Sequence, residues 1–280
     1  MTWKLVADSG CDLKTLDLTS KGKFERVPLT IQVGQEIFVD DLTLDIDKMM
    51  DKMYTTSTAS KSACPSPDDY IKAFDGADNI IIITITGTLS GSQNSAQVAK
   101  QLYQEEHPNV NIHVIDSLSA GGEIDLLMTK LGELINQELT FDQVVTKITD
   151  YQKKTKLIFV LAKVDNLVKN GRLSKLIGAV VGLLNIRMVG EASREGTLEL
   201  LQKARGYKKS LFATYDEMKK AGYAGGKIVM AHRHNDKFCQ ELSQLIRADY
   251  PQAAIEELPT SGLCSFYAEE GGLLIGYEIS

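Results

Sequence analysis

The sequence predicts an α/β protein of two α/β domains, the first with a mostly parallel sheet and flanking helices, the second with a mixed sheet and helices. Three observations lead to this fold class. The 280 residues suit two ordinary domains better than one large core. Short apolar runs alternate with longer amphipathic stretches along the chain. The runs 79–85 and 111–116 are rich in β-branched residues, as in strands buried on both faces, and each precedes a helix-length segment.

The first domain is expected to cover residues 1–155. A helix is expected to open at Thr43 as its N-cap and to run to about Tyr54, because acidic residues follow in the first turn. The expected strands are 4–8, 24–33, 79–85 and 111–116, and the other expected helices are 92–106, 122–137 and 140–154.

The second domain is expected to cover residues 156–280. Its expected strands are 156–161, 188–189, 197–201, 227–232, 253–258 and 273–279, and its expected helices are 207–221 and 237–250. The strand 253–258 is expected at a sheet edge, and the strand 273–279 is expected to close the sheet.

Composition and charge exclude several classes of function. The net charge of −6, with acidic and basic residues interleaved, argues against a surface that binds nucleic-acid phosphates. No apolar stretch approaches the ~20 residues that a membrane-spanning helix needs. The four cysteines are dispersed without a CxxC pair, so we expect free thiols and a cytoplasmic protein. His232 and His234 have no partner motif for a metal, so no metal site is expected.

Small and hydroxyl-bearing residues follow several of the expected strands. They occupy the turns 8–13, 86–92 and 116–122, and a further loop at 61–67. Ligands of open parallel sheets bind beyond the carboxyl ends of the strands, where helix N-termini favour an anion. Helix capping explains each turn taken alone. Together the turns indicate a nearly neutral cradle for a carboxylate or a phosphate.

No catalytic group stands out in the sequence. A nucleophile elbow, a phosphate loop and a dinucleotide fingerprint are all absent. Cys64 has no evident base and Ser90 no evident partner, so an enzyme of small anions is the weaker hypothesis. The chain is expected to bind a ligand without a cofactor. The apolar segment 176–186 is either core or the wall of a tunnel, which Ile177, Val180, Leu183 and Ile186 would then line.

A series of motifs over the whole chain resembles the DegV family of bacterial fatty-acid-binding proteins. Any one of these motifs is weak evidence by itself. Together they are strong evidence, because they occur in the family's order and spacing over the whole chain. The family patterns ADSxxDL, KTSxPS, LSGTYQSA, DS, GGR and KxRG match residues 7–13, 61–66 (weakly), 89–96, 116–117, 170–174 and 203–206.

The resemblance implies a long-chain fatty acid, such as palmitate, stearate or oleate, held non-covalently between two α/β domains. It implies that Ser62, Ser90, Gly91 and Ser92 hold the carboxylate, and that the tail lies in an apolar tunnel. It also implies a separate ATP-dependent fatty-acid kinase as a partner. Arg172 would be a contact of that kinase near the ligand mouth, and the alternative is that it forms a surface ion pair.

One family motif has no clear counterpart in this chain. The family's C-terminal HxGPG aligns with residues 267–272, so that Tyr267 or Ala268 takes the place of the histidine. A carboxylate of Glu269 or Glu270 beside the head group would repel a fatty acid. An alternative hypothesis is therefore a diverged protein that binds a lipid or a small anion, or acts as a sensor, without a kinase.

Overall fold

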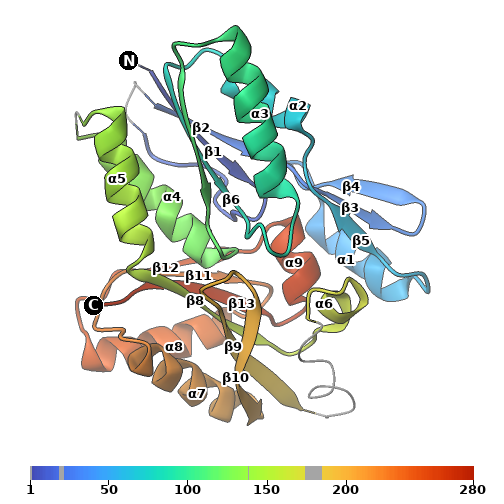
Figure 1. Ribbon diagram of the computed structural model, residues 1–280. Coiled ribbons are helices and arrows are strands. Elements are labelled where there is room, and N and C mark those ends of the chain that lie inside the picture. The colour runs from blue at the N-terminus through green and yellow to red at the C-terminus, as the bar shows by residue number, and fades with distance from the viewer. Residues whose placement is uncertain (1, 19–21, 138, 174–184) are drawn as a thin grey trace.

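The computed structural model describes residues 2–18, 22–137, 139–173 and 185–280. The chain is a mixed α/β protein with two sheets stacked on either side of helix α4 (Gly122–Ile135), as Figure 1 shows. Helix α4 packs against β1 and β6 of the first sheet and against β8, β11 and β13 of the second. The expected fold class is confirmed.

The first sheet is parallel throughout, and its two central strands are buried on both faces. Its order is β2 (Gly22–Val27), β1 (Trp3–Asp8), β6 (Asn79–Thr84), β7 (Asn111–Asp116). One apolar layer joins it to α2 (Pro67–Phe74) and α3 (Ser92–Glu106), and another joins it to α4 and α5 (Phe141–Gln152). This double covering explains the continuous apolar runs of the sequence.

The expected strand 24–33 is wrong, because the chain leaves the parallel sheet at Pro28. Proline has no N–H to donate to a ladder, and the next residues form β3 (Thr30–Val33) of a separate antiparallel sheet. That sheet has the order β4 (Glu36–Val39), β3, β5 (Lys61–Ala63). Packed on it is α1 (Ile46–Thr55), together with residues of the C-terminal half.

Helix α1 begins two residues later than the sequence indicated. Its N-cap is Asp45, whose side chain accepts a hydrogen bond from Lys48 N at 3.0 Å. The backbone N–H and the hydroxyl of Thr43 both donate to Asp41, at 2.8 and 2.7 Å. Thr43 therefore belongs to the preceding turn, in which the Asp41 carboxylate accepts both of its hydrogen bonds.

The second sheet is mixed and has six strands. Its order is β10 (Leu198–Arg205), β9 (Ile186–Ala192), β8 (Thr155–Leu161), β13 (Leu273–Glu278), β11 (Ile228–His232), β12 (Ile255–Pro259). Only β11 and β12 pair in parallel. Strand β12 lies at an edge as expected, whereas β13 lies between β8 and β11 rather than at a margin.

Helices cover both faces of the second sheet. On one face lie α7 (Tyr207–Lys220) and α8 (Asp236–Asp249), and on the other lies the start of α4. At Gly122 a Cβ would meet Val229 O at 2.5 Å and Gly276 N at 2.7 Å. Glycine is required there because the helix backbone touches the sheet backbone.

Three described helices were not expected from the sequence: α2, α6 (Asp165–Lys169) and α9 (Gly262–Ala268). Helix α9 starts at the boundary between the two halves, where carboxylates of the first half accept its first amide protons. Asp12 accepts from Ser261 N at 2.6 Å, and Asp40 accepts from the next two amides, both at 2.7 Å. These bonds anchor α9 to the N-terminal half.

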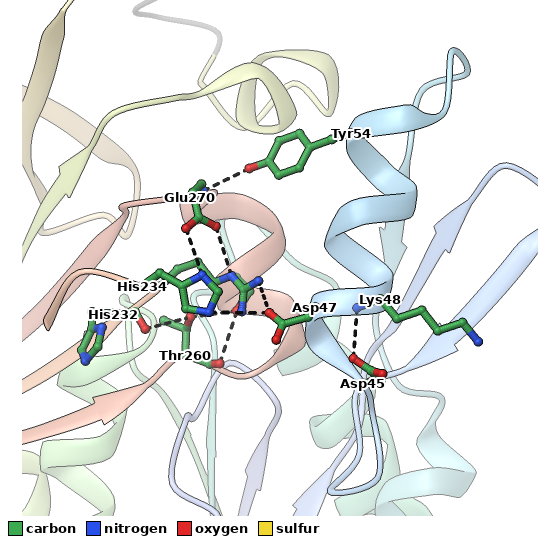
Figure 2. Close-up of polar contacts among 10 residues, drawn as sticks. Asp45, Asp47, Lys48, Tyr54, His232, His234, Thr260 and Glu270 are labelled. Atoms are coloured by element: carbon green, nitrogen blue, oxygen red, sulfur yellow. Dashed lines mark hydrogen bonds and ion pairs between the residues drawn. The ribbon is translucent and has the colours of Figure 1, made fainter.

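A polar cluster joins α1 to the second half of the chain, as Figure 2 shows. Arg233 Nη2 donates to Asp47 Oδ1 at 2.5 Å, and Arg233 Nε lies 3.6 Å from Glu270. Glu270 N donates to the hydroxyl of Tyr54 at 3.0 Å, and a ring nitrogen of His234 lies 2.9 Å from Glu270. We call these five residues the α1 clasp.

Candidate functional site

An apolar cavity of about 300 Å³ lies between the two halves of the chain. Its floor is the face of the second sheet that carries Leu157, Phe159 and Leu161 of β8, with Leu198 of β10 and Leu274 of β13 beside them. Alternate residues of a strand point to the same face, so one strand supplies three of these side chains. The alternating residues of β8 pack on the other side of the sheet, against α7 and α8.

Helix α9 forms one wall of the cavity. Leu263, Cys264, Tyr267 and Ala268 all line it, and their spacing places them on one face of a helix. The N-terminal half supplies the facing wall with apolar side chains that include Leu29, and with the small residues of β5 and of the turn before α3. The site is thus built jointly by both halves.

The polar end of the cavity consists mainly of hydroxyl groups. Ser62 Oγ of β5 and the Tyr267 hydroxyl of α9 are 2.8 Å apart, and either can be the donor. Two hydroxyls carry two protons, and their mutual bond uses one of them. The second proton remains to be donated to a ligand oxygen. Tyr267 thus lies at the polar end of the cavity, and it is one of the two residues that the resemblance aligned with the family histidine.

Ser90 and Gly91 lie at the same end, directly before α3. Ser90 Oγ accepts a hydrogen bond from Ser92 N at 3.2 Å, so its own proton is available to a ligand. Gly91 is the N-cap of the 15-residue helix α3. The first amides of a helix and its dipole favour a negative charge at this position.

Ser92 is placed differently from the other three serine and glycine candidates. Its side chain is fully buried and is not among the described residues that line the cavity. The Ser92 hydroxyl donates to Asp8 Oδ2 and lies 2.7 Å from the Tyr70 hydroxyl. Its single proton is therefore already used, and it has none to give to a ligand carboxylate.

Arg172 is the one charged side chain among the described residues that line the cavity. Its Nε donates to Leu89 O at 3.3 Å and its Nη1 to Asn170 O at 2.5 Å. The guanidinium carbon lies 6.0 Å from the centre of the Tyr267 ring. A cation held this way beside the hydroxyls makes the polar end attractive to an anion.

The two glutamates after α9 point away from this end. Glu269 accepts a hydrogen bond from Asn166 N at 3.1 Å, and burial raises its pKa. Glu270 belongs to the α1 clasp. Neither is among the described residues that line the cavity, so no side-chain carboxylate from this segment competes with a ligand carboxylate there.

The tail residues expected from the sequence are located only in part. Ile177, Val180 and Leu183 lie outside the described residues. Ile186 is half-buried at the start of β9 and is not among the described residues that line the cavity. The floor of β8, β10 and β13 and the wall of α9 were not among the predicted site residues. The spacing of residues 263, 264, 267 and 268 is a weak signal for that wall.

The described part of the chain contains no candidate metal centre. Within it no group of three or more His, Cys, Asp or Glu side chains could hold a metal ion. Among the described helices, none is long and apolar enough to cross a membrane. The four cysteines are free thiols, and Cys64 at the cavity is the exposed one.

Comparisons with known proteins agree with this architecture. The profile described as "Uncharacterised protein, DegV family" matches residues 2–279. The chain belongs to the DegV family. A DegV domain-containing protein of Streptococcus gordonii is 74% identical over 280 residues, which is the full length of both chains.

Two solved structures of the DegV family show what similar chains contain. The Fatty Acid Kinase B3 protein of Streptococcus pneumoniae, loaded with linoleic acid, is 70% identical with a TM-score of 0.98 over the whole of both chains. A DegV family protein of Eubacterium eligens, loaded with heptadecanoic acid, is 37% identical with a TM-score of 0.94, also over both whole chains.

Proposed function

We propose that this chain binds a long-chain fatty acid, such as palmitate, stearate or oleate, non-covalently between its two domains, 1–155 and 156–280. The acyl chain lies on the floor of β8, β10 and β13. The carboxylate lies at Ser62, Ser90 and Gly91, with the Tyr267 hydroxyl as a further donor. The observation that carries this proposal is an apolar cavity that ends in hydroxyl groups, a helix N-terminus and one arginine.

The energetics favour tight binding without a covalent bond. Burial of about 14 methylene groups at ~0.8 kcal/mol each contributes roughly 11 kcal/mol before the cost of association is subtracted. The carboxylate needs donors rather than a full counter-charge, because several hydrogen bonds and a helix N-terminus already favour its ionised form. Apolar residues select the tail, and the polar end fixes its orientation.

Similar proteins support the ligand class. The similar streptococcal and Eubacterium eligens structures are loaded with linoleic and heptadecanoic acid, respectively. These two chains cover the whole of this one, so the similarity extends to every element that builds the cavity.

We further propose that the bound acid is presented to a separate ATP-dependent fatty-acid kinase. The kinase would transfer the γ-phosphoryl group of ATP to a carboxylate oxygen, which forms an acyl phosphate and releases ADP. The description of the 70% identical protein as a fatty acid kinase B3 protein supports this partner. Arg172, at the polar end of the cavity, is proposed as a contact of the kinase.

The ligand part of the proposal is tested by denaturing the purified protein and analysing the extract by mass spectrometry. We expect a fatty acid at about one molecule per chain. A chain that is empty and takes up neither added palmitate nor added oleate would contradict the proposal.

The kinase part is tested separately, with the fatty-acid kinase of Streptococcus pneumoniae, ATP and oleate-loaded protein. We expect acyl phosphate with the unchanged chain, and at least tenfold less with Arg172→Ala at equal oleate loading. Lys169→Ala, which removes a nearby cation from α6 outside the cavity lining, is the matched control. Oleate binding without any acyl phosphate would favour the kinase-independent sensor instead.

A further inference from the structure

The buried groups behind the head-group turn form a hydrogen-bonded chain that touches no ligand position. Tyr70 of α2, Ser92 of α3 and Asp8 of β1 are consecutive members, with the Ser92 hydroxyl between the other two. Each of the three residues is 0% exposed. An ionised carboxylate can only accept, so Ser92 donates to Asp8 and accepts the proton of Tyr70.

Asp8 also holds the backbone of two neighbouring turns. Its Oδ1 accepts from Gly10 N at 2.9 Å, and its Oδ2 accepts from Ile85 N at 3.0 Å. Ile85 begins the turn that ends at Ser90 and Gly91. Both ends of that turn are thus bound to one carboxylate, through the Ile85 amide at its start and the Ser92 hydroxyl at its end.

We propose that Asp8, Ser92 and Tyr70 are positioning residues, which hold Ser90 and Gly91 at the geometry that binds the ligand carboxylate. They act only through the turn, since none of the three is among the described residues that line the cavity. This proposal rests on the proposed fatty-acid binding and gives Ser92 a different role from that of a direct ligand.

Among the three hydrogen-bonded residues, substitution of Ser92 is expected to have the largest effect, because Ser92 bonds to both of the others. Its loss would leave both the Tyr70 hydroxyl and one lone pair of Asp8 without a partner in a site closed to water. A threonine keeps the hydroxyl and adds one methyl group. Comparison of the alanine and threonine variants therefore distinguishes the effect of the lost hydrogen bonds from the effect of altered packing of the helix.

The test measures oleate affinity for Ser92→Ala, Ser92→Thr, Ser90→Ala and the double variant Ser90→Ala/Ser92→Ala. We expect Ser92→Ala to bind about tenfold more weakly and Ser92→Thr to bind within threefold of the unchanged chain. If Ser92 acts through Ser90, the double variant binds no more than threefold more weakly than Ser90→Ala. Affinity losses that multiply, or failure of threonine to restore binding, would overturn the proposal.

A matched control is Ser210→Ala. Ser210 is also fully buried in the first turn of a helix, α7, but lies away from the cavity and donates to Tyr207 O at 2.7 Å. We expect this variant to lose stability without losing oleate affinity. An equal affinity loss in Ser210→Ala would assign the effect of Ser92→Ala to general destabilisation.

Hydrogen exchange of the ligand-free protein tests the same geometry without any fatty acid. We expect the amide of Ile85 to exchange at least tenfold faster in Ser92→Ala, with unchanged exchange in β11 of the second sheet. Unchanged exchange at Ile85 would overturn the positioning role. If the unchanged chain binds no fatty acid but Ile85 responds as expected, the proposed function fails while the positioning of the turn stands.

Discussion

The cavity and the α1 clasp are two places where the halves of this chain meet, and their side chains differ in polarity. The cavity is lined by apolar side chains, with hydroxyls and the single cation of Arg172 at one end. The clasp pairs Arg233 with two carboxylates, and its acidic members Asp47 and Glu270 have side chains 69% and 43% exposed. The carboxylates of the clasp are thus partly solvated, and no carboxylate is among the described residues that line the cavity.

The difference predicts that an added carboxylate acts very differently in the two places. Leu198→Glu places a negative charge in the cavity lining and is expected to weaken oleate binding by about 2 kcal/mol or more, roughly thirtyfold. Leu42→Glu, at a leucine that is 62% exposed and near the N-terminus of α1, is the control and should bind normally. Isothermal titration measures both, and equal binding by the two variants would contradict the proposed position of the acyl chain.

Removal of the clasp arginine is expected to affect stability and not the ligand. Arg233→Ala leaves Asp47 and Glu270 without their cation, and the exposure of both partners limits the loss to about 1–2 kcal/mol of unfolding free energy. Chemical denaturation measures that loss, and titration should find oleate affinity within twofold of the unchanged chain. A large affinity loss would mean that the clasp and the cavity are energetically coupled.

Asp8, which lies behind the turn at the cavity, and Asp47, which belongs to the α1 clasp, are expected to give opposite pH dependences. Burial raises the pKa of Asp8 to about 6, whereas the hydrogen bond from Arg233 lowers the pKa of Asp47. For Asp8 the folded pKa is above the unfolded one, so the folded chain binds the proton more tightly and stability rises as pH falls through 6. For Asp47 the folded pKa is below the unfolded one, so its stabilising contribution is lost only at more acidic pH.

Asp8→Asn measures the first of these contributions. From pH 7 to pH 5, protonation of Asp8 is expected to add about 1 kcal/mol to the unfolding free energy of the unchanged chain. Denaturation at the two pH values should show a gain smaller by about that amount in the variant. An identical pH response of both proteins would show that Asp8 does not titrate in this range.

The smallest expected effect on oleate affinity is that of removing the Tyr267 hydroxyl at the polar end of the cavity. Tyr267→Phe removes one hydroxyl of the pair with Ser62 and keeps the ring, so oleate affinity should fall by about 1 kcal/mol, roughly fivefold. Tyr54→Phe, which removes a hydroxyl from the α1 clasp, is the matched control and should leave affinity unchanged. Titration with oleate compares the two, and equal affinities would remove Tyr267 from the head-group site.

Much of the fold could be predicted because local patterns coincide with the final packing. The parallel strand β6 is buried at every position, and its run of four isoleucines is accordingly apolar. Pro28 was the missed signal for the end of β2. Helix α9 was missed because six of its seven residues are buried, so its sequence carries no alternation between polar and apolar faces.

The site could be predicted at its polar end and much less along its apolar length. Motif resemblance selected Ser62, Ser90, Gly91 and Arg172, and all four line one cavity. The cavity floor was not predictable, because every position of β8 from Leu157 onward is apolar and periodicity cannot show which face lines a ligand site. Nor could sequence show that the Ser92 hydroxyl is already used, since that depends on its packing against Asp8 and Tyr70.

The most direct test of the central claim is the ¹³C NMR spectrum of carboxyl-labelled oleate bound to the protein. We predict one bound carboxyl resonance, present at about one oleate per chain. It should shift in Ser62→Ala and in Tyr267→Phe but not in Arg233→Ala. No bound resonance, or a resonance that neither cavity variant moves, would contradict a fatty-acid carboxylate held by the hydroxyls between the two halves.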